Sequence, residues 1–432
     1  MPQLKRVSIY RGGPHSWNPN HIHHHRIMTH NDIESNVVSM LDNLFKEFGS
    51  AKNLDLFIDQ CWEPIHNDML EDIKYFINGV KQSRPSWRIF LQLNTHSKHH
   101  KSYFEQLPLD GIVIIDFFLY QVVRQTVITN GNPVSVRSFN KFNDPKFLFL
   151  TGRAHKPHRI RLLKRFADCG LLDKATWSFF YHDQSTFYND LVRDQLPELS
   201  DQEFDDFVTK WDCNPDQILQ SVGLYGTQYD GFPYGVEMYS KTDFSVISET
   251  NFDLTSNPWI TEKTWRPIIN SHPFIIAGDS GTYKHLKGLG FETFEKLLAV
   301  PKFYEIADVE QRLDATVNNV QHWTGTLSTH ADFVNAAIMH NKKTLIHLYD
   351  VAYNQISKFI QQHDLTSYSL DEVLPTLSNN SIGKKKTPNT FVAFYNDIKD
   401  PTWPECKDES DFYLLPQKIQ DECIGFGYAP TK

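Results

Sequence analysis

The sequence predicts an α/β fold with two successive Rossmann-type units and a mostly helical segment after them. Short apolar runs alternate with amphipathic stretches over residues 1–140, and the alternation restarts after a polar, turn-rich segment at residues 129–145. Strands that alternate with helices favour parallel sheets covered on both faces. After Pro301 the pattern becomes that of helices. We therefore expect three regions, comprising residues 1–140, 141–300 and 301–432.

The elements of the first two regions follow from apolar runs typical of strands and amphipathic stretches typical of helices. In the first region we expect strands at residues 7–10, 54–58, 87–93 and 111–115, with helices at 33–48 and 67–80. In the second region we expect strands at residues 146–150, 176–180, 244–247 and 273–277, with helices at 157–169, from 262 and at 282–289. Residues 183–222 are expected to be polar and irregular. Helices at 309–320, 331–340 and 345–363 follow, and then a tail of loops.

Composition excludes several classes of protein. The 432 residues are 40% hydrophobic and 22% charged, which fits a globular chain of two domains. The net charge of -9 disfavours a protein that coats nucleic acid nonspecifically. The five cysteines are scattered and contain no C-x-x-C pair, so they indicate a reducing compartment rather than a disulfide framework. Without a signal peptide or an apolar membrane span, we expect a cytoplasmic protein that makes no membrane contact.

Charged side chains open the short helix that follows the strand at residues 244–247. Glu262, Lys263 and Arg266 lie in its first turns, where α/β enzymes hold a phosphate and the sugar attached to it. A cation in the first turn opposes the helix dipole, and a bound diphosphate would explain Lys263 there. Glu262 would then accept hydrogen bonds from sugar or ribose hydroxyls. Ordinary charges on a solvated helix face remain the alternative.

A second cluster of cations follows the strand at residues 146–150. Arg153 lies in the turn, Pro157 suits the first helical position, and Arg159 falls in the first turn of the next helix. A phosphate would reconcile Arg159 with the helix dipole. The alternative is a basic solvated helix, because further cations continue along it at Arg161, Lys164 and Arg165.

Polar residues also end several predicted strands. Glu249 and Asn251 follow the strand at 244–247, where ligands of open α/β sheets bind, although a loop with Asx-type turns is the alternative. A general base must reach its acceptor hydroxyl at hydrogen-bond distance. The candidates for that base are Asp59 and Glu63 after the strand at 54–58, and Asp116 after the strand at 111–115.

Other chemistry is disfavoured. The histidines between His21 and His25 could ligate zinc, but no carboxylate or cysteine stands at ligand spacing nearby, so no metal is expected. The chain has neither a G-x-x-x-x-G-K-[ST] nor a G-x-G-x-x-G motif, which disfavours a P-loop and a nicotinamide cofactor. Since no Asp-x-Asp triplet occurs, we expect Lys and Arg, and no cofactor, to neutralise a leaving group.

The segment 244–276 resembles the donor-binding motif of the family 10 glycosyltransferases, the α1,3-fucosyltransferases. The resemblance lies in a strand ending in Ser-Glu-Thr-Asn, followed by Ile-Thr-Glu-Lys, a helix and Pro-Phe-Ile-Ile. It implies a GT-B fold, with two Rossmann-type units facing a cleft, and inverting, metal-independent chemistry. It also implies donor contacts for Glu249, Glu262 and Lys263, and makes Arg159 similar to the family's arginine that grips the donor diphosphate.

The strings at residues 261–268 and 289–294 also resemble glycosyltransferase-like proteins of bacteriophages and large viruses. This resemblance implies host cytoplasm as the location and widens the acceptor to a glycan or a hydroxymethylated base of viral DNA. An extruded base would need an electropositive groove. The candidates for such a groove are Lys98, His99, His100, Lys101 and Arg124.

Our prediction is a glycosyltransferase that moves a hexosyl or pentosyl unit from a nucleotide-diphosphate sugar to an acceptor hydroxyl. Residues 1–140 would serve the acceptor and residues 141–300 the donor. The alternatives are a nonenzymatic nucleotide- or glycan-binding module, a glycan-directed fucosyltransferase-like enzyme, and a phosphate-recognising structural protein of a virion.

Overall fold

A computed structural model of the chain describes residues 3–7, 10–11, 26–27, 33–60, 65, 67–116, 118–120, 122–123, 145–153, 156–180, 193–211, 239, 241–368 and 373. The chain divides into two compact units. Unit 1 comprises Met1–Tyr120 and Leu348–Asn380, and unit 2 comprises Gln121–His347 and Ser381–Lys432. The residues predicted to form a C-terminal extension are therefore shared between the units. The boundary predicted between residues 140 and 141 lies outside the described residues.

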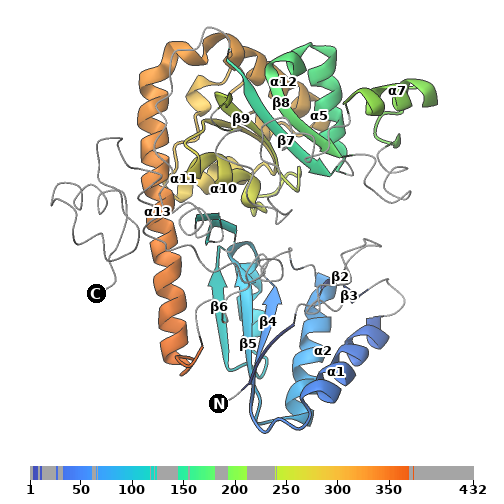
Figure 1. The fold of residues 1–432 in the computed structure, drawn as a ribbon, viewed down its shortest axis with the longest axis vertical. Coiled ribbons are helices and arrows are strands. Elements are labelled where there is room, and N and C mark those ends of the chain that lie inside the picture. Colours follow the sequence, from blue (N-terminus) through green and yellow to red (C-terminus); the bar gives the residue numbers. More distant parts are fainter. Residues whose placement is uncertain are drawn as a thin grey trace, which may run out of the picture. The chain divides into compact units, whose positions relative to one another are not determined.

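Unit 1 is built on a four-stranded parallel sheet (Figure 1). Its strands stand in chain order, β1 (Gln3–Val7), β4 (Leu54–Gln60), β5 (Arg88–Asn94) and β6 (Gly111–Ile115). Apolar residues of β4 and β5 pack in one core with α1 (Ile33–Phe48) and α2 (Asn67–Ser83). Unit 1 also contains the short parallel pair β2 (Tyr10–Arg11) and β3 (Arg26–Ile27), the 3-10 helix η1 (Thr95–His100) and α3 (Lys101–Phe104).

The other face of this sheet is covered by the end of the long helix α13 (Ala331–Gln362) and the residues after it. Phe90 stacks on Phe57 and meets the ring of Phe359 edge-on, with centroids 4.9 and 5.7 Å apart. Arg88 donates to the carbonyl of His363 at 2.6 Å. The sheet is therefore buried on both faces, which parallel sheets require.

Unit 2 is built on a second four-stranded parallel sheet, in which the strand order is β10-β9-β7-β8. Its strands are β7 (Phe147–Arg153), β8 (Ala175–Phe180), β9 (Phe244–Ser248) and β10 (Phe274–Ala277). From β7 the chain first adds β8 on one side and then returns to add β9 and β10 on the other. The strand order therefore reverses between β7 and β9, whereas the described strands of unit 1 show no reversal.

Helices and short turns complete unit 2. They are α5 (Pro157–Asp168), η2 (Leu171–Lys174), α7 (Asp201–Trp211), α10 (Glu262–Ile269), α11 (Thr282–Gly288), η3 (Glu295–Leu297), η4 (Phe303–Glu305), α12 (Val309–Thr326) and η5 (Leu327–His330). Helix α5 begins with Pro157, buries a stripe that includes Leu162 and Phe166, and gives way to Gly170 in the left-handed region. The predicted α/β fold class is confirmed in its elements: two units, each built on a four-stranded parallel sheet with helices, and further helices after residue 300.

Three predictions about the secondary structure were wrong. The first strand spans Gln3–Val7 rather than residues 7–10. Part of the stretch expected to be irregular is helix α7, which Ser200 and Glu203 open as a capping box, each bonding the backbone N–H of the other. The helices predicted at 331–340 and 345–363 are one continuous α13, because no Gly or Pro separates them.

In the part of the chain that the structure describes, no helix is long and apolar enough to span a bilayer.

Candidate functional site

The carboxyl ends of β7 and β9 form the point where the strand order of unit 2 reverses. The two strands are paired neighbours, with Leu150 opposite Ile247. In open α/β sheets, ligands bind in the crevice outside the strand ends at such a reversal. Arg153 is the last residue of β7, Arg159 lies in the first turn of α5, and Glu249 directly follows β9. The fold thus gathers these three sequence-predicted residues at one edge of the sheet.

Glu249 is completely buried, and its carboxylate is fully used by its own chain. One oxygen accepts the backbone N–H of Thr261 at 3.1 Å and the hydroxyl of Thr264 at 2.6 Å. The other accepts the hydroxyl of Thr261 at 2.7 Å and the N–H of Thr250 at 3.2 Å. Four donors match the capacity of a carboxylate. Glu249 therefore fixes the start of α10, and its negative charge lies at the positive end of that helix.

The first turn of α10 carries its own ion pair. Thr261 caps the helix, and its hydroxyl also accepts from the Lys263 ammonium at 3.2 Å. The same ammonium donates to the Glu262 carboxylate at 3.0 Å, and both side chains are half-buried. Burial raises the pKa of Glu262, but the charges of Lys263 and Arg266 outweigh it and hold that pKa at about 2. Lys263 therefore already has an anionic neighbour in the chain.

Tyr239, which the sequence did not single out, belongs to the same surroundings. Its side chain is buried, and burial raises its pKa to about 12, with the charge of Arg266 opposing that change and the charge of Glu262 adding to it. Arg266 is half-buried, and its charge lowers the pKa of both Glu262 and Tyr239, so it lies near both side chains. No spacing rule could have found Tyr239, because it precedes β9 outside any motif at a strand end or a helix start.

The N-terminus of α5 differs from that of α10. It has no side-chain cap and no acidic residue in its first turn. His158 and Arg159 are both buried, and both donate to the backbone carbonyl of Glu249, at 2.9 and 3.4 Å. Burial, followed by the charge of Arg159, lowers the pKa of His158 to about 3, so this imidazole is neutral and donates through Nε2. The first turn of α5 thus contains no acidic residue that would offset the positive end of the helix dipole.

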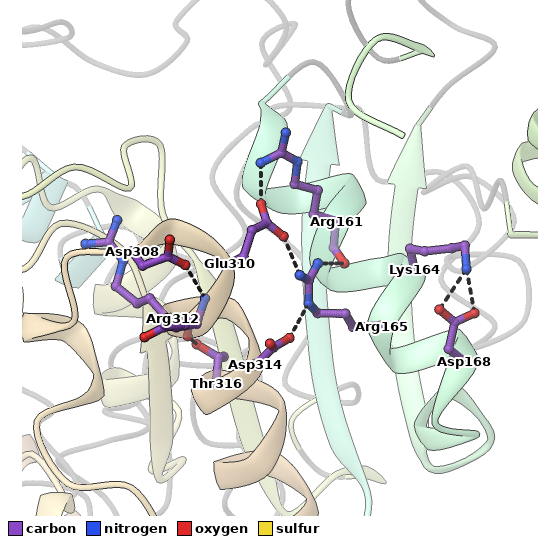
Figure 2. A network of polar contacts seen from close by, with 10 residues as sticks. Arg161, Lys164, Arg165, Asp168, Asp308, Glu310, Arg312, Asp314 and Thr316 are labelled. Carbon is purple, nitrogen blue, oxygen red and sulfur yellow. Dashed lines mark hydrogen bonds and ion pairs between the residues drawn. The ribbon is translucent and has the colours of Figure 1, made fainter. Parts of the chain in front are cut away.

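The remaining cations of α5 do not belong to this site (Figure 2). Arg161 pairs with Glu310 at 2.6 Å, and Arg165 pairs with Glu310 and Asp314 of α12. Lys164 pairs with Asp168 at 2.7 Å on α5 itself. Arg161 and Arg165 thus hold α5 against α12, and Lys164 pairs within α5, as expected for the alternative of an ordinary charged helix face.

The candidate bases lie in unit 1. Asp59 is buried inside β4, opposite Gln92, rather than after the strand. Asp116 follows β6, is half-buried, and accepts the N–H of Leu119 at 3.1 Å. Glu63 lies outside the described residues. In unit 2, Asn251 is half-buried in the loop after Glu249.

The two other predicted clusters are only partly visible. Lys98, His99 and Lys101 are exposed after β5, and His100 is buried against the carbonyl of Ile65. Arg124 and residues 21–25 lie beyond the described ranges. Within those ranges, no group of His, Cys, Asp and Glu residues could hold a metal ion.

No family model and no curated protein matches the sequence. Among solved structures, the chain is similar to an α,α-trehalose 6-phosphate synthase from Burkholderia multivorans, with 8% identity, a TM-score of 0.42 and 79% of each chain covered. It is also similar to a UDP-forming α,α-trehalose-phosphate synthase from Burkholderia xenovorans, with 8% identity, a TM-score of 0.36, and 78% of this chain and 80% of that chain covered. The N-terminal domain of Candida albicans trehalose-6-phosphate phosphatase gives 10% identity, a TM-score of 0.36, and coverage of 80% and 84%. These similarities are too low to carry an argument about function, and the resemblance to the family 10 enzymes stays a prediction.

Proposed function

We propose that the chain is a glycosyltransferase that transfers a hexosyl or pentosyl unit from a nucleotide-diphosphate sugar to an acceptor hydroxyl. The observation that carries the proposal is the N-terminus of α5. It stands at the strand reversal of unit 2, has no acidic residue or side-chain cap, and bears the buried Arg159. Backbone N–H groups at such a helix end, together with a guanidinium, suit the phosphates of a nucleotide.

In this proposal the start of α10 serves the rest of the donor. The Glu249 carboxylate already lies at the positive end of the α10 dipole. The phosphates therefore bind at the N-terminus of α5 rather than at that of α10. Glu262 stays ionised and accepts hydroxyls of the ribose or the sugar, while Lys263 and Arg159 stabilise the charge that grows on the leaving diphosphate. We expect no metal ion and no cofactor to take part.

The acceptor hydroxyl needs a general base, and Asp116 is our candidate because it is half-buried at a strand end, whereas Asp59 lies inside a strand. A single in-line displacement would invert the anomeric centre. The acceptor is a glycan or a hydroxymethylated base of viral DNA. Salt-sensitive binding of duplex DNA to the purified protein would support a DNA base as the acceptor. No binding of duplex DNA at low salt would exclude that acceptor.

A thermal-shift screen against UDP, GDP and their sugars tests the donor site, because a ligand that binds the native state raises its melting temperature. We expect at least one nucleoside diphosphate to stabilise the parent and to stabilise Arg159→Met less. Transfer activity is then measured with the same donor. Lys263→Ala should lower turnover roughly 10²-fold, because the ammonium acts on the leaving group. Unchanged turnover would remove that role.

A nonenzymatic nucleotide-binding module is the second candidate. It is favoured by the full use of the Glu249 carboxylate within the chain, which leaves no carboxylate oxygen there for a substrate. Slow hydrolysis of a nucleotide sugar without acceptor would identify the enzyme. Binding without any hydrolysis or transfer would favour the module.

A further inference from the structure

Arg312 on α12 is the most deeply buried cation in the part of the chain that the structure describes, with 1% of its surface exposed. Its Nη2 donates to the carbonyl of Phe252 at 2.5 Å, and the guanidinium lies 4.0 Å from the centre of the Phe252 ring. Among the described residues, its Nε and Nη1 have no hydrogen-bond partner, and it forms no ion pair. The guanidinium is thus held by one carbonyl and one aromatic face.

Such an arrangement does little for the stability of the fold. A buried charge with unused donors is costly, and an apolar side chain of similar volume in its place is often neutral or stabilising. Burial lowers the pKa of Arg312, against the opposing effect of Asp253 and Asp279. The role of Arg312 therefore lies in fixing the position of Phe252, the residue that it contacts.

A short series of contacts joins Arg312 to the proposed diphosphate site. The Phe252 ring lies almost parallel to the imidazole of His158, with centroids 5.1 Å apart. His158 donates to the carbonyl of Glu249, and Arg159 donates to the same oxygen. Four side chains from α12, the loop after β9 and α5 therefore converge on the strand end where α5 begins.

The loop after β9 is also fixed by an anion. Asp279, which is 2% exposed, accepts the N–H of Asp253 at 2.9 Å and the N–H of Trp259 at 3.0 Å. The loop between residues 250 and 260 is thus held by Asp279 at two points and by Arg312 at Phe252. Arg312 lies outside residues 141–300, the segment predicted to bind the donor, whereas Asp279 lies inside it, just after the motif at residues 244–276.

We propose that Arg312 is a positioning residue for the diphosphate site, which acts through Phe252 and His158 on Arg159. The inference rests on the proposed function, since it gives the buried guanidinium a purpose at that site. Removing Arg312 would release Phe252 and leave the His158 ring without a fixed neighbour. The pair of donors on the Glu249 carbonyl, including Arg159, would then lose its fixed orientation, and binding of a nucleoside diphosphate would weaken.

The test uses the full chain and four variants. Arg312→Met removes the charge at similar volume, Arg312→Lys keeps the charge over the ring, and Phe252→Leu removes the ring. Arg165→Met is the matched control, because it removes an arginine of the same helix interface that leaves Phe252 untouched (Figure 2). Melting temperature, calorimetric affinity for UDP and GDP, and hydrogen–deuterium exchange of residues 250–260 are measured for each.

We expect Arg312→Met to melt at or above the parent temperature, to bind the nucleoside diphosphate at least tenfold more weakly, and to exchange faster at residues 250–260. Phe252→Leu should weaken binding too, Arg312→Lys should recover part of the affinity, and Arg165→Met should bind like the parent. A large loss of melting temperature in Arg312→Met with unchanged affinity would overturn the proposal in favour of a purely structural role. If the parent binds neither UDP nor GDP, the proposed function fails by itself. The exchange rates then decide alone, and parent-like exchange in Arg312→Met would overturn the positioning role.

Discussion

At the scale of single residues, Glu249 illustrates how a ligand-like position can serve the fold. Both of its oxygens are filled by Thr250, Thr261 and Thr264. Glu249→Gln would place an amide N–H₂ against donors that include backbone N–H groups, which cannot rotate away. We expect a loss of about 1–3 kcal/mol in the free energy of unfolding, the usual penalty for an unsatisfied buried group. Urea unfolding measures it, with the half-buried Glu262→Gln as a control. Equal stability of the parent and Glu249→Gln would contradict this assignment.

His158 makes stability depend on pH. Its folded pKa of about 3 is depressed from 6.5, so the unfolded chain takes up the proton first as the pH falls. Its contribution is fully present above pH 6.5 and declines as the pH drops from there toward 3. Between pH 7 and pH 5 this amounts to about 2 kcal/mol. In His158→Gln, which keeps a donor for the Glu249 carbonyl, that part of the acid sensitivity should vanish.

Melting curves of the parent and His158→Gln at pH 7 and pH 5 measure the difference. His330→Gln is the control, because His330 is exposed. An equal drop in melting temperature for the parent and His158→Gln would show that this imidazole is not the source of the acid sensitivity.

Residue types at helix starts could be predicted from the sequence, whereas their partners could not. Local spacing placed Arg159 and Lys263 in first turns, as the structure has them. The bond between Arg312 and the Phe252 carbonyl spans 60 positions, and Glu249 meets Thr264 across 15. Such pairs depend on how helices and strands pack, and no local pattern encodes that packing. For this reason the buried Arg312 was missed.

At the scale of elements, strands were predicted best where apolar runs end sharply. The bounds of β6 match the prediction, whereas β4 continues to Gln60. Asp59 and Gln60 are polar, so the sequence indicated an end at Ile58. Pairing with Gln92 and Leu93 of β5 keeps both residues in the sheet. Element ends that tertiary pairing decides are thus outside the reach of a local pattern.

Helix α10 ends in a Schellman motif that lacks its usual glycine. Ser271 has a φ of 57°. Its N–H donates to the carbonyl of Ile268 at 3.1 Å, and the N–H of His272 donates to the carbonyl of Pro267 at 2.8 Å. The Ser271 hydroxyl is buried and has no partner in the described part of the chain. Ser271→Gly removes both the left-handed strain and the unpaired hydroxyl. We expect a gain of about 1 kcal/mol in the free energy of unfolding, measured by denaturant.

Ser256→Gly serves as its control, because Ser256 is an exposed loop residue without a positive φ. There the added backbone freedom should leave stability unchanged or lower it. If Ser271→Gly behaves like Ser256→Gly, the left-handed position does not strain the helix end.

At the scale of the whole molecule, the sequence predicted two successive sheets but not the return of the chain to the first. The periodicity of residues 345–363 indicated a helix and carried no information on which unit it would cover. The partners that decide it are scattered: Tyr368 donates to Asp55 at 2.8 Å, and Gln92 donates to the carbonyl of Val373. Gly111 of β6 lies close to the same segment, since a Cβ there would come within 2.8 Å of the His363 ring and would force that ring to shift.

Unit 1 should therefore fail to fold from its N-terminal part alone. Residues 1–120 without residues 348–380 would expose Phe57 and Phe90, both completely buried in the chain, and leave Asp55 without Tyr368. Burial of one such ring contributes about 2 kcal/mol or more, a large part of the stability of a small domain. We expect residues 1–120 to show no cooperative thermal transition by circular dichroism and to regain one when a peptide of residues 348–380 is added. In the full chain, Phe359→Ala should destabilise this unit by roughly 3 kcal/mol, because it removes the ring that meets Phe90. A fragment of residues 1–120 that melts cooperatively without the peptide would show that the returning segment only rests on a sheet that is already stable.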